Sequence, residues 1–247
     1  MIALQLYTVR ERTAQDFIGT LRQLADMGYR SVEFAGYGDN SVQDLRSALD
    51  EYGLQAVSAH VPFSHMENNT QQALQELQTL GCSHAVVPGI PQDRRATAEQ
   101  VRALAETFNH LGQACKEQGL QFGYHNHAHE FEPLDGSTMF DIIAEGTDPG
   151  LVNLELDLFW AQYGGVDPIG LLQRHAGRMP LLHFKDMEND TERSDAPVGA
   201  GILPYEEYIA AAKAAGAQVF IVEQDHPRNA MEDVRTSLRN LERLVGQ

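Results

Sequence analysis

The stretch LADMGYRSVEF (24–34) joins a helical pattern to an apolar, β-branched run through one glycine, Gly28. A glycine at this place is typical of a helix that ends in a left-handed turn shortly before a strand begins. The chain contains further copies of the same arrangement: LDEYGLQAVSAH (49–60), LQTLGCSHAVV (77–87), CKEQGLQFGYHN (115–126), RHAGRMPLLHF (174–184) and AAKAAGAQVFIVE (211–223). Another unit has Asp148-Pro149-Gly150 before LVNLELD (151–157). The sequence therefore predicts a repeated helix–turn–strand unit.

This repeat, with IALQLY (2–7) as its first strand, predicts eight strands. The expected strands are 2–7, 30–35, 54–60, 84–88, 120–126, 151–157, 180–185 and 218–223. Amphipathic segments predict the helices, and examples are 13–27, 67–80, 97–118 and 228–245. Strands that alternate with helices lie parallel, and eight such units close a barrel of about 250 residues. We therefore predict an α/β protein with a single (β/α)8 TIM-barrel domain over residues 1–247; an open doubly wound sheet is the alternative.

The composition narrows the expected partners and compartment. The 35 acidic and 18 basic side chains give a net charge of −17, which repels phosphate backbones and anionic lipid. Nucleic acid is therefore not an expected partner, and no run approaches the roughly 20 apolar residues of a membrane span. Cys82 and Cys115 lie among apolar neighbours without a CxxC partner, so we expect packing residues in a reduced, cytoplasmic protein. A homo-oligomer is compatible with the sequence.

Functional side chains of such a barrel come from the C-terminal ends of the strands and from the loops that follow. Seven of the ten histidines fall at or just after a predicted strand end: His60, His65, His125, His127, His129, His183 and His226. Three carboxylates, Glu130, Asp157 and Glu223, are expected at the same mouth. Buried carboxylates repel one another unless a cation compensates them. Oxygen and nitrogen ligands without cysteine suit one divalent metal ion, such as Mn, Mg, Co, Zn or Fe.

Side-chain alternation refines the choice on two strands. Asn153, Glu155 and Asp157 share one face, and Asp157, nearest the mouth, is expected to reach the metal. Glu155 lies one layer deeper, either as a partner of a ligand or as a buried residue paired with histidine or lysine. His183 and Lys185 also share a face. Lys185 is placed to hold a substrate oxyanion or to tune a carboxylate, and a salt bridge to Asp157 or Glu155 is the alternative.

Five segments at the strand ends carry a family resemblance: VSAHVPF (57–63), GYHNHAHEF (123–131), LELDLFW (154–160), LLHFKDM (181–187) and IVEQDHP (221–227). Together they resemble the sugar phosphate isomerase/epimerase family, which is part of the xylose isomerase-like barrel superfamily. That superfamily includes inosose dehydratases, ketose 3-epimerases, hydroxypyruvate isomerases and, more distantly from this chain, endonuclease IV. The resemblance spans the whole chain and is specific to the superfamily, but not to one reaction.

The resemblance implies one divalent metal held by a Glu of strand 5, an Asp of strand 6, a His of strand 7 and a Glu of strand 8. The last three correspond to Asp157, His183 and Glu223. Strand 5 reads Tyr-His-Asn-His here, which departs from the family pattern. Glu130 is the nearest carboxylate and is preferred as the first ligand, whereas His125 is the alternative.

The other residues of the mouth are expected to bind and convert a small sugar or polyol. Epimerases of the superfamily often have a histidine three residues after the metal-binding Asp, where this chain has Trp160. An indole cannot exchange protons, but it can stack on the apolar face of a sugar ring. We expect substrate contacts from Glu33, His125, His127 and Trp160. The expected catalytic residues are Glu130, Glu223, His60 and Lys185.

The expected reaction is proton removal next to a carbonyl, through an enediolate, by a metal-dependent isomerase or epimerase. Glu130 or Glu223 would take the proton, and the other carboxylate, or His60 or His127, would return it. Loss of a β-oxygen would instead make the protein a dehydratase or lyase for a keto-polyol or 3-keto-glycoside, like an inosose dehydratase. A metal-free barrel that binds sugar without catalysis is the third hypothesis.

Overall fold

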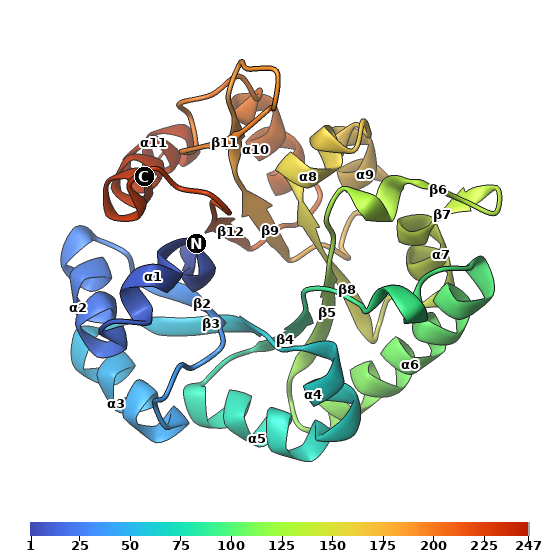
Figure 1. The fold of residues 1–247 in the computed structure, drawn as a ribbon, viewed down its shortest axis with the longest axis horizontal. Helices are drawn as coiled ribbons and strands as arrows, with labels where there is room; N and C mark the ends of the chain where they lie inside the picture. The colour runs from blue at the N-terminus through green and yellow to red at the C-terminus, as the bar shows by residue number, and fades with distance from the viewer. Residues whose placement is uncertain (247) are drawn as a thin grey trace.

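The computed structural model describes residues 1–246, and the expected strands form a closed parallel barrel (Figure 1). In chain order the barrel strands are β1 (Ile2–Gln5), β2 (Ser31–Ala35), β3 (Gln55–His60), β4 (His84–Val87), β5 (Gln121–His125), β8 (Val152–Asp157), β9 (Leu181–Phe184) and β12 (Val219–Val222). Around the barrel their order is β1-β12-β9-β8-β5-β4-β3-β2, and β1 pairs in parallel with both β2 and β12. This closure confirms the predicted (β/α)8 barrel and excludes the open sheet.

A ring of helices surrounds the barrel (Figure 1). The helices that follow the strands on the outside are α2 (Phe17–Met27), α3 (Val42–Tyr52), α5 (Thr70–Leu80), α6 (Ala98–Glu117), α7 (Met139–Gly146), α9 (Pro168–Arg174), α10 (Tyr205–Ala214) and α11 (Ala230–Val245). Shorter elements fill the loops after the strands: η1 (Leu6–Val9), α1 (Arg10–Thr13), α4 (Phe63–Asn68), η2 (Gln92–Arg94), η3 (His129–Phe131), β6 (Pro133–Leu134), β7 (Ser137–Thr138), α8 (Leu158–Tyr163), β10 (Asp186–Met187) and β11 (Asp195–Ala196). These loops build the end of a barrel where active sites lie.

The interior of the barrel changes from apolar to charged along the strands. An apolar cluster fills its lower part: Ala3, Val57, Val86, Leu181, Val219 and Ile221. Because side chains alternate, the residues two positions beyond Leu181 and Ile221 point to the same interior, and these are His183 and Glu223. The apolar cluster therefore supports a charged layer directly above it. The larger core lies outside the barrel, where helix residues such as Phe108 pack on strand residues such as Phe122, with ring centroids 5.4 Å apart.

Three element boundaries differ from the prediction for local reasons. The first strand ends at Gln5 because the Gln5 side chain accepts a hydrogen bond from Tyr7 N and starts the short helix η1. The helix expected at 13–27 begins only at Phe17, since the Asp16 side chain caps it by accepting from Gly19 N. The helix expected at 67–80 is divided at Asn69, whose φ of −131° is not helical.

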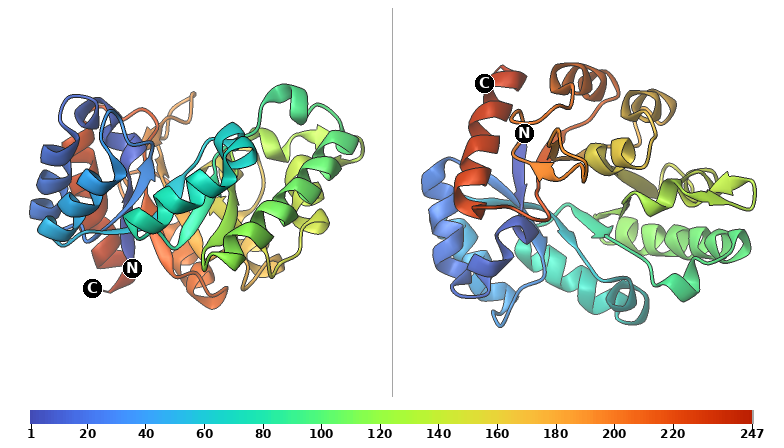
Figure 2. Two further views of the ribbon diagram at one scale, coloured as in Figure 1. Left: turned by 90° about the horizontal axis from the view of Figure 1, so that it is seen from below. Right: turned by 45° about the horizontal axis from the view of Figure 1, so that its top comes forward.

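Gly53, Gly81 and the two cysteines behave as predicted, whereas Gly28 ends α2 with φ of 123° and ψ of −9°, outside the left-handed helical region. Gly53 and Gly81 end their helices with φ of 67° and 80°, a conformation that costs a residue with a Cβ atom more than it costs glycine. Cys82 and Cys115 are both buried and free. In the part of the chain that the structure describes, no helix is both long enough and apolar enough to cross a membrane. The start of β1 and the end of α11 lie on the same side of the barrel (Figure 2).

Candidate metal centre and active site

Four side chains from neighbouring strands converge at the barrel mouth. His125 ends β5, Asp157 ends β8, His183 lies in β9 and Glu223 follows β12. These four strands are consecutive around the barrel, and one ligand atom from each residue lies within 4.8 Å of the others. All four side chains are buried. We call these four residues the donor set. Three of them are the ligands expected from the sequence, and the fourth is the alternative strand-5 ligand, His125.

The ammonium group of Lys185 compensates the carboxylates of the donor set. Its Nζ atom lies 2.9 Å from Asp157 Oδ2, 2.8 Å from Glu223 Oε2 and 2.8 Å from Asp225 Oδ2. Burial alone would lower the pKa of Lys185, but the three carboxylates outweigh it and hold that pKa well above its usual value. Burial also raises the pKa of Asp157 to about 6, against the effect of Lys185. The salt bridge between Lys185 and Asp157, one of the sequence-based alternatives, is therefore present.

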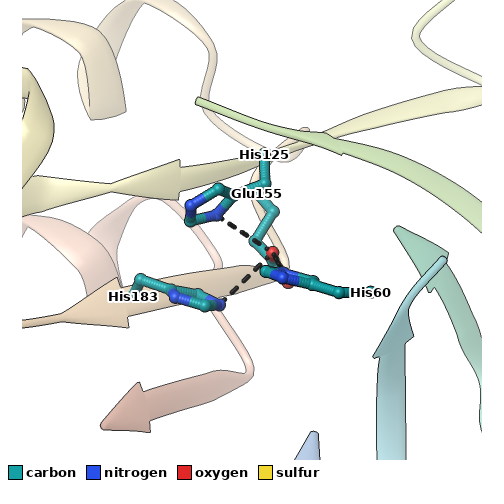
Figure 3. A group of neighbouring side chains, drawn as sticks. All are labelled: His60, His125, Glu155 and His183. Atoms are coloured by element: carbon teal, nitrogen blue, oxygen red, sulfur yellow. Dashed lines mark hydrogen bonds and ion pairs between the residues drawn. The ribbon is translucent and has the colours of Figure 1, made fainter. Parts of the chain in front are cut away.

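Glu155 lies at the centre of three imidazoles, one layer below (Figure 3). Its Oε2 atom is 2.7 Å from His60 Nε2, 3.2 Å from His125 Nδ1 and 3.3 Å from His183 Nε2. Burial alone would raise the pKa of Glu155, but His183 and His60 outweigh it and hold that pKa well below its usual value. The alternation argument, which allowed pairing of Glu155 with histidine, is confirmed. These four residues also bring one ligand atom each within 4.8 Å of the others.

His183 connects the donor set to a deeper carboxylate. Its Nδ1 atom lies 2.7 Å from Glu223 Oε2, and its Nε2 atom lies 2.8 Å from Glu33 Oε1. Glu33 also accepts hydrogen bonds from Gln5 Nε2, at 2.6 Å, and from Ser58 Oγ. Burial raises the pKa of Glu33, whereas its carboxylate helps to raise the pKa of His183 well above the usual value, against the effect of burial. The sequence analysis expected Glu33 to contact the substrate. In the structure its carboxylate contacts the buried side chains of His183, Gln5 and Ser58.

A cavity of ≈ 390 Å³ opens at the mouth above these groups. Its polar lining consists of His60, His125, His127, Glu223 and Asp225, and the rest of its wall comes from Tyr7, Ala35, Gly36, Pro62 and Pro88. A larger hollow of ≈ 800 Å³ lies between α1 and the start of α11, but none of the described residues that line it belongs to the donor set. The smaller cavity is therefore the one in which a substrate can meet the donor set.

Two histidines of this cavity, His60 and His127, have pKa values shifted in opposite directions. Burial alone would lower the pKa of His60, but Glu33 and Glu155 outweigh it and raise that pKa above its usual value. Burial lowers the pKa of His127 to about 4. The surroundings thus favour the protonated form of His60 and the neutral form of His127.

Glu130, the preferred strand-5 ligand from the sequence, lies in η3 and is buried. Its carboxylate accepts hydrogen bonds from Tyr124 Oη at 2.6 Å and from His127 N at 2.8 Å, and it lies 3.0 Å from His129 Nε2. These contacts and the nearby imidazole lower the pKa of Glu130 even though burial raises it. Neither of the two candidate metal-binding groups found among the described residues contains Glu130.

Trp160 stands beside the mouth on the first turn of α8. Its backbone N–H donates to Asp157 Oδ1 at 2.8 Å, so Asp157 both ends β8 and caps this helix. The Trp160 ring lies 5.9 Å from the ring of His127, and Lys185 Nζ lies 5.3 Å from its centroid. The indole is therefore fixed next to the cavity, as the stacking hypothesis requires.

The donor set fits a divalent cation. Asp157 Oδ2 is buried and forms no hydrogen bond within the described chain, although Lys185 Nζ lies at ion-pair distance, and His125 Nε2 lies 3.9 Å from this oxygen. Two imidazoles and two carboxylates, without thiolate, are ligands that suit Mn, Co, Zn or Fe(II). Burial and the neighbouring His183 lower the pKa of His125, which keeps the imidazole neutral, the form that binds metals.

A closed barrel with this constellation defines the class of the protein. The chain belongs to the xylose isomerase-like TIM barrel family, whose model matches residues 21–244, and this confirms the resemblance seen in the sequence. An inosose dehydratase of Geobacillus kaustophilus (strain HTA426) is 27% identical over 194 residues, which cover 69% of this chain and 62% of that protein. The chain thus aligns with less than two thirds of that relative.

Solved structures of similar shape extend over nearly the whole chain. A sugar phosphate isomerase/epimerase from Parabacteroides distasonis ATCC 8503 has a TM-score of 0.83 and 26% sequence identity, covering 98% of this chain and 93% of its own. The IOLI protein, solved with a binding zinc atom, has a TM-score of 0.78 and 16% identity, covering 99% and 98% of the two chains. At 16% identity, the similarity to the IOLI protein shows a shared fold only. The chain is thus related to isomerases, epimerases and dehydratases.

The sequence analysis assigned no role to Asp225, which pairs with Lys185 in the structure. The available signal was alternation, since Glu223 and Asp225 lie two residues apart at the end of one strand. The same signal, applied to β5, places Gly123 and His125 on one face and Tyr124 on the other. Because the chain bends after a strand end, the sequence alone does not place Glu130 relative to that face.

Proposed function

We propose that this protein is a metal-dependent isomerase or epimerase that removes a proton next to the carbonyl group of a sugar or polyol. The observation that carries the proposal is the convergence of four ligand atoms within 4.8 Å of one another at the mouth of the barrel. A cavity of ≈ 390 Å³ adjoins them, and its wall carries two further imidazoles, His60 and His127. Barrels of this type carry out catalysis at this end.

The donor set would hold the cation, with His125 in the place that the family gives to a glutamate. When bound, a divalent cation draws electron density from a substrate carbonyl and so acidifies the neighbouring C–H bond. In this proposal Glu130 is a positioning residue rather than a ligand, because its carboxylate accepts the backbone N–H of His127. Lys185 keeps the carboxylates of Asp157 and Glu223 aligned through its two ion pairs with them.

His127 and His60 are the proposed acid/base pair, since both line the cavity. His127 takes the proton from carbon, and the enediolate that remains is protonated again from His60 or from His127 itself. Return of the proton to the neighbouring carbon gives an isomer, whereas return to the opposite face of the same carbon gives an epimer. Glu33 and Glu155 hold His60 in place: Glu33 Oε1 lies 3.2 Å and Glu155 Oε2 lies 2.7 Å from its Nε2 atom.

A second candidate function is dehydration, which the inosose dehydratase relatives support. The first step is the same removal of a proton next to a carbonyl. The electron pair then expels a hydroxyl group from the next carbon, and this hydroxyl leaves as water after it takes a proton from His60. The same side chains serve both reactions, so the fate of the enediolate distinguishes them.

Solvent deuterium exchange tests the proposal. The manganese-loaded protein is incubated in D2O with an inosose and with a panel of ketohexoses, and substrate and product are followed by NMR. Deuterium in an isomeric sugar supports the isomerase or epimerase, and an unsaturated product supports the dehydratase. Asp157→Asn and His183→Gln should abolish exchange, whereas Asp26→Asn, at an exposed position on α2, should not. Absence of exchange with every compound, together with a metal content unchanged in the Asp157 and His183 variants, would contradict the proposal.

A further inference from the structure

We infer that a second sugar-binding subsite lies over α8, next to the reaction cavity, and that it binds a second hexose ring of the substrate. The inference rests on the proposed function in one respect: the reacting ring is assigned to the cavity lined by His60 and His127. It adds the substrate class, which becomes a two-ring glycoside rather than a free monosaccharide. Among the residues that line it are Phe159, Trp160, Tyr163, Arg193, Asp195 and Asp225.

The second cavity adjoins the first. It has a volume of ≈ 370 Å³, against ≈ 390 Å³ for the reaction cavity, and Asp225 lines both. Trp160 lines only the second, but its ring is 5.9 Å from the ring of His127, which lines the first. Because Asp225 lines both cavities, two linked rings can occupy them with one ring in each.

One wall of the second cavity is aromatic and rigid. Trp160 packs edge-on against Phe159, with centroids 5.0 Å apart, and against Tyr163, with centroids 5.3 Å apart. Phe159 is buried, whereas Trp160 and Tyr163 remain partly exposed. The partly exposed ring of Trp160, held by these neighbours, presents an apolar face at little cost in conformational entropy, and such a face suits the C–H face of a hexose.

A polar wall adjoins the aromatic one and belongs to the segment between β10 and β11, which lies beside α8 (Figure 1). The guanidinium carbon of Arg193 sits 3.9 Å from the centroid of the Tyr163 ring. Arg193 has a φ of 52°, an unfavourable conformation for a residue other than glycine, and this conformation occurs where the side chain meets the ring. The segment is tied to the loop after β12 because Asp195 Oδ2 accepts hydrogen bonds from the backbone N–H groups of Asp225 and His226.

This polar wall favours a hexose over an aromatic ring as the occupant. Arg193 offers hydrogen-bond donors, and Asp195 and Asp225 offer acceptors, around the edge of the aromatic surface. The hydroxyl groups of a hexose can satisfy these groups when the cavity loses its water. A phenyl ring would stack equally well but would leave them unpaired, which is unfavourable for each group.

The single tryptophan of the chain makes the test direct, since it lies in the subsite. Tryptophan fluorescence is followed while the manganese-loaded protein is titrated with glucose, cellobiose, maltose and phenyl β-glucoside. We expect at least one disaccharide to bind about tenfold more tightly than glucose, and more tightly than the phenyl glucoside. The readout is the ratio of the disaccharide affinity to the glucose affinity.

Tyr163→Ala and Arg193→Ala should each reduce this ratio to within about twofold of unity, because each removes part of one wall. Arg102→Ala, an exposed arginine on α6, is the matched control and should preserve it. Arg193 is itself exposed, so its variant keeps the test valid if the Tyr163 variant fails to fold. Equal affinities for glucose and both disaccharides, no disaccharide binding, tighter phenyl glucoside binding, or a ratio that survives both substitutions would each overturn the inference. The titration measures binding without turnover. If no deuterium exchange occurs but the disaccharide still binds about tenfold more tightly than glucose, the proposed reaction is wrong and the subsite stands.

Discussion

The Nζ atom of Lys185 and the Oε2 atom of Glu223 lie 2.8 Å apart, and both side chains are buried. The same ammonium group meets Asp157 and Asp225 at 2.9 Å and 2.8 Å. A cation bound by the donor set would share Asp157 and Glu223 with this ammonium group. Lysine and metal are therefore expected to compete electrostatically for the same two carboxylates.

Replacement of Lys185 by methionine should separate its stabilising effect on the folded protein from its competition with a bound metal. Without metal, the variant should lose about 3–5 kcal/mol of unfolding free energy, because buried carboxylates lose their partner. Its affinity for Mn²⁺ should rise by at least about tenfold, since a neighbouring positive charge is gone. Urea unfolding with and without Mn²⁺, and calorimetric titration, measure both effects. Lys213→Met, at an exposed position on α10, is the control, and weaker metal binding by the Lys185 variant would refute the competition.

A pair of substitutions decides the strand-5 ligand. His125→Ala should reduce the affinity for Mn²⁺ by more than about 100-fold, the upper range for loss of a group that only supports a ligand. Glu130→Gln should reduce it by less than about tenfold, because Glu130 contacts Tyr124 and the backbone of His127 rather than the donor set. Metal content after dialysis, with a chelator-treated sample as the baseline, distinguishes the two. The opposite order of effects would return Glu130 to the ligand position.

Stability should depend on pH through His84, which is 4% exposed at the start of β4. Burial lowers the pKa of His84 below its usual 6.5, so the folded protein holds it neutral. As the pH falls below 6.5, the unfolded chain gains a proton at His84 that the folded chain does not, and unfolding becomes more favourable. The contribution is therefore present above that pH and is lost as the pH falls, with a slope of up to about 1.4 kcal/mol per pH unit. Urea midpoints between mildly acidic and neutral pH should show a flatter profile for His84→Gln, while the exposed His110→Gln should match the parent protein.

Arg178 should be important for the stability of the barrel wall. Its Nε atom donates to Val152 O at 3.0 Å, its Nη1 atom donates to Ala144 O at 2.5 Å, and Nη2 donates to Thr147 Oγ1. Arg178→Met would leave these buried acceptors without a donor and should cost about 3 kcal/mol in unfolding free energy. Arg174→Met, whose exposed ion pair with Asp141 is 3.2 Å long, should cost less than about 1 kcal/mol. Equal losses in thermal and urea unfolding would contradict this assignment.

The fold could be predicted because its signals are local. Six of the eight barrel strands follow a glycine at the end of a helix, and alternation along β8 and from β9 onward orders Asp157 above Glu155 and places His183 and Lys185 on one face. Those relationships need no knowledge of the rest of the chain. The start of α2 at Phe17 was missed because it depends on one capping interaction of Asp16.

The rest of the candidate site depends on contacts between distant parts of the chain. Glu33 meets His183 across 150 positions of sequence, and Lys185 meets Asp225 across 40. No periodicity encodes which carboxylate a buried imidazole or ammonium group will meet. The position of Glu130 likewise depends on the hydroxyl group of Tyr124 and on a backbone turn after β5, so composition and spacing favoured it as a ligand although neither candidate metal-binding group contains it.

The two carboxylate oxygens of Asp157 have different tasks. Oδ1 caps α8 by accepting the backbone N–H of Trp160, while Oδ2 faces Lys185 and the donor set. The cap uses only a main-chain group of residue 160, so it does not depend on which side chain stands there. Side chains at positions 160 and 163 of the proposed subsite can therefore be varied while the backbone cap still holds the Asp157 carboxylate in place.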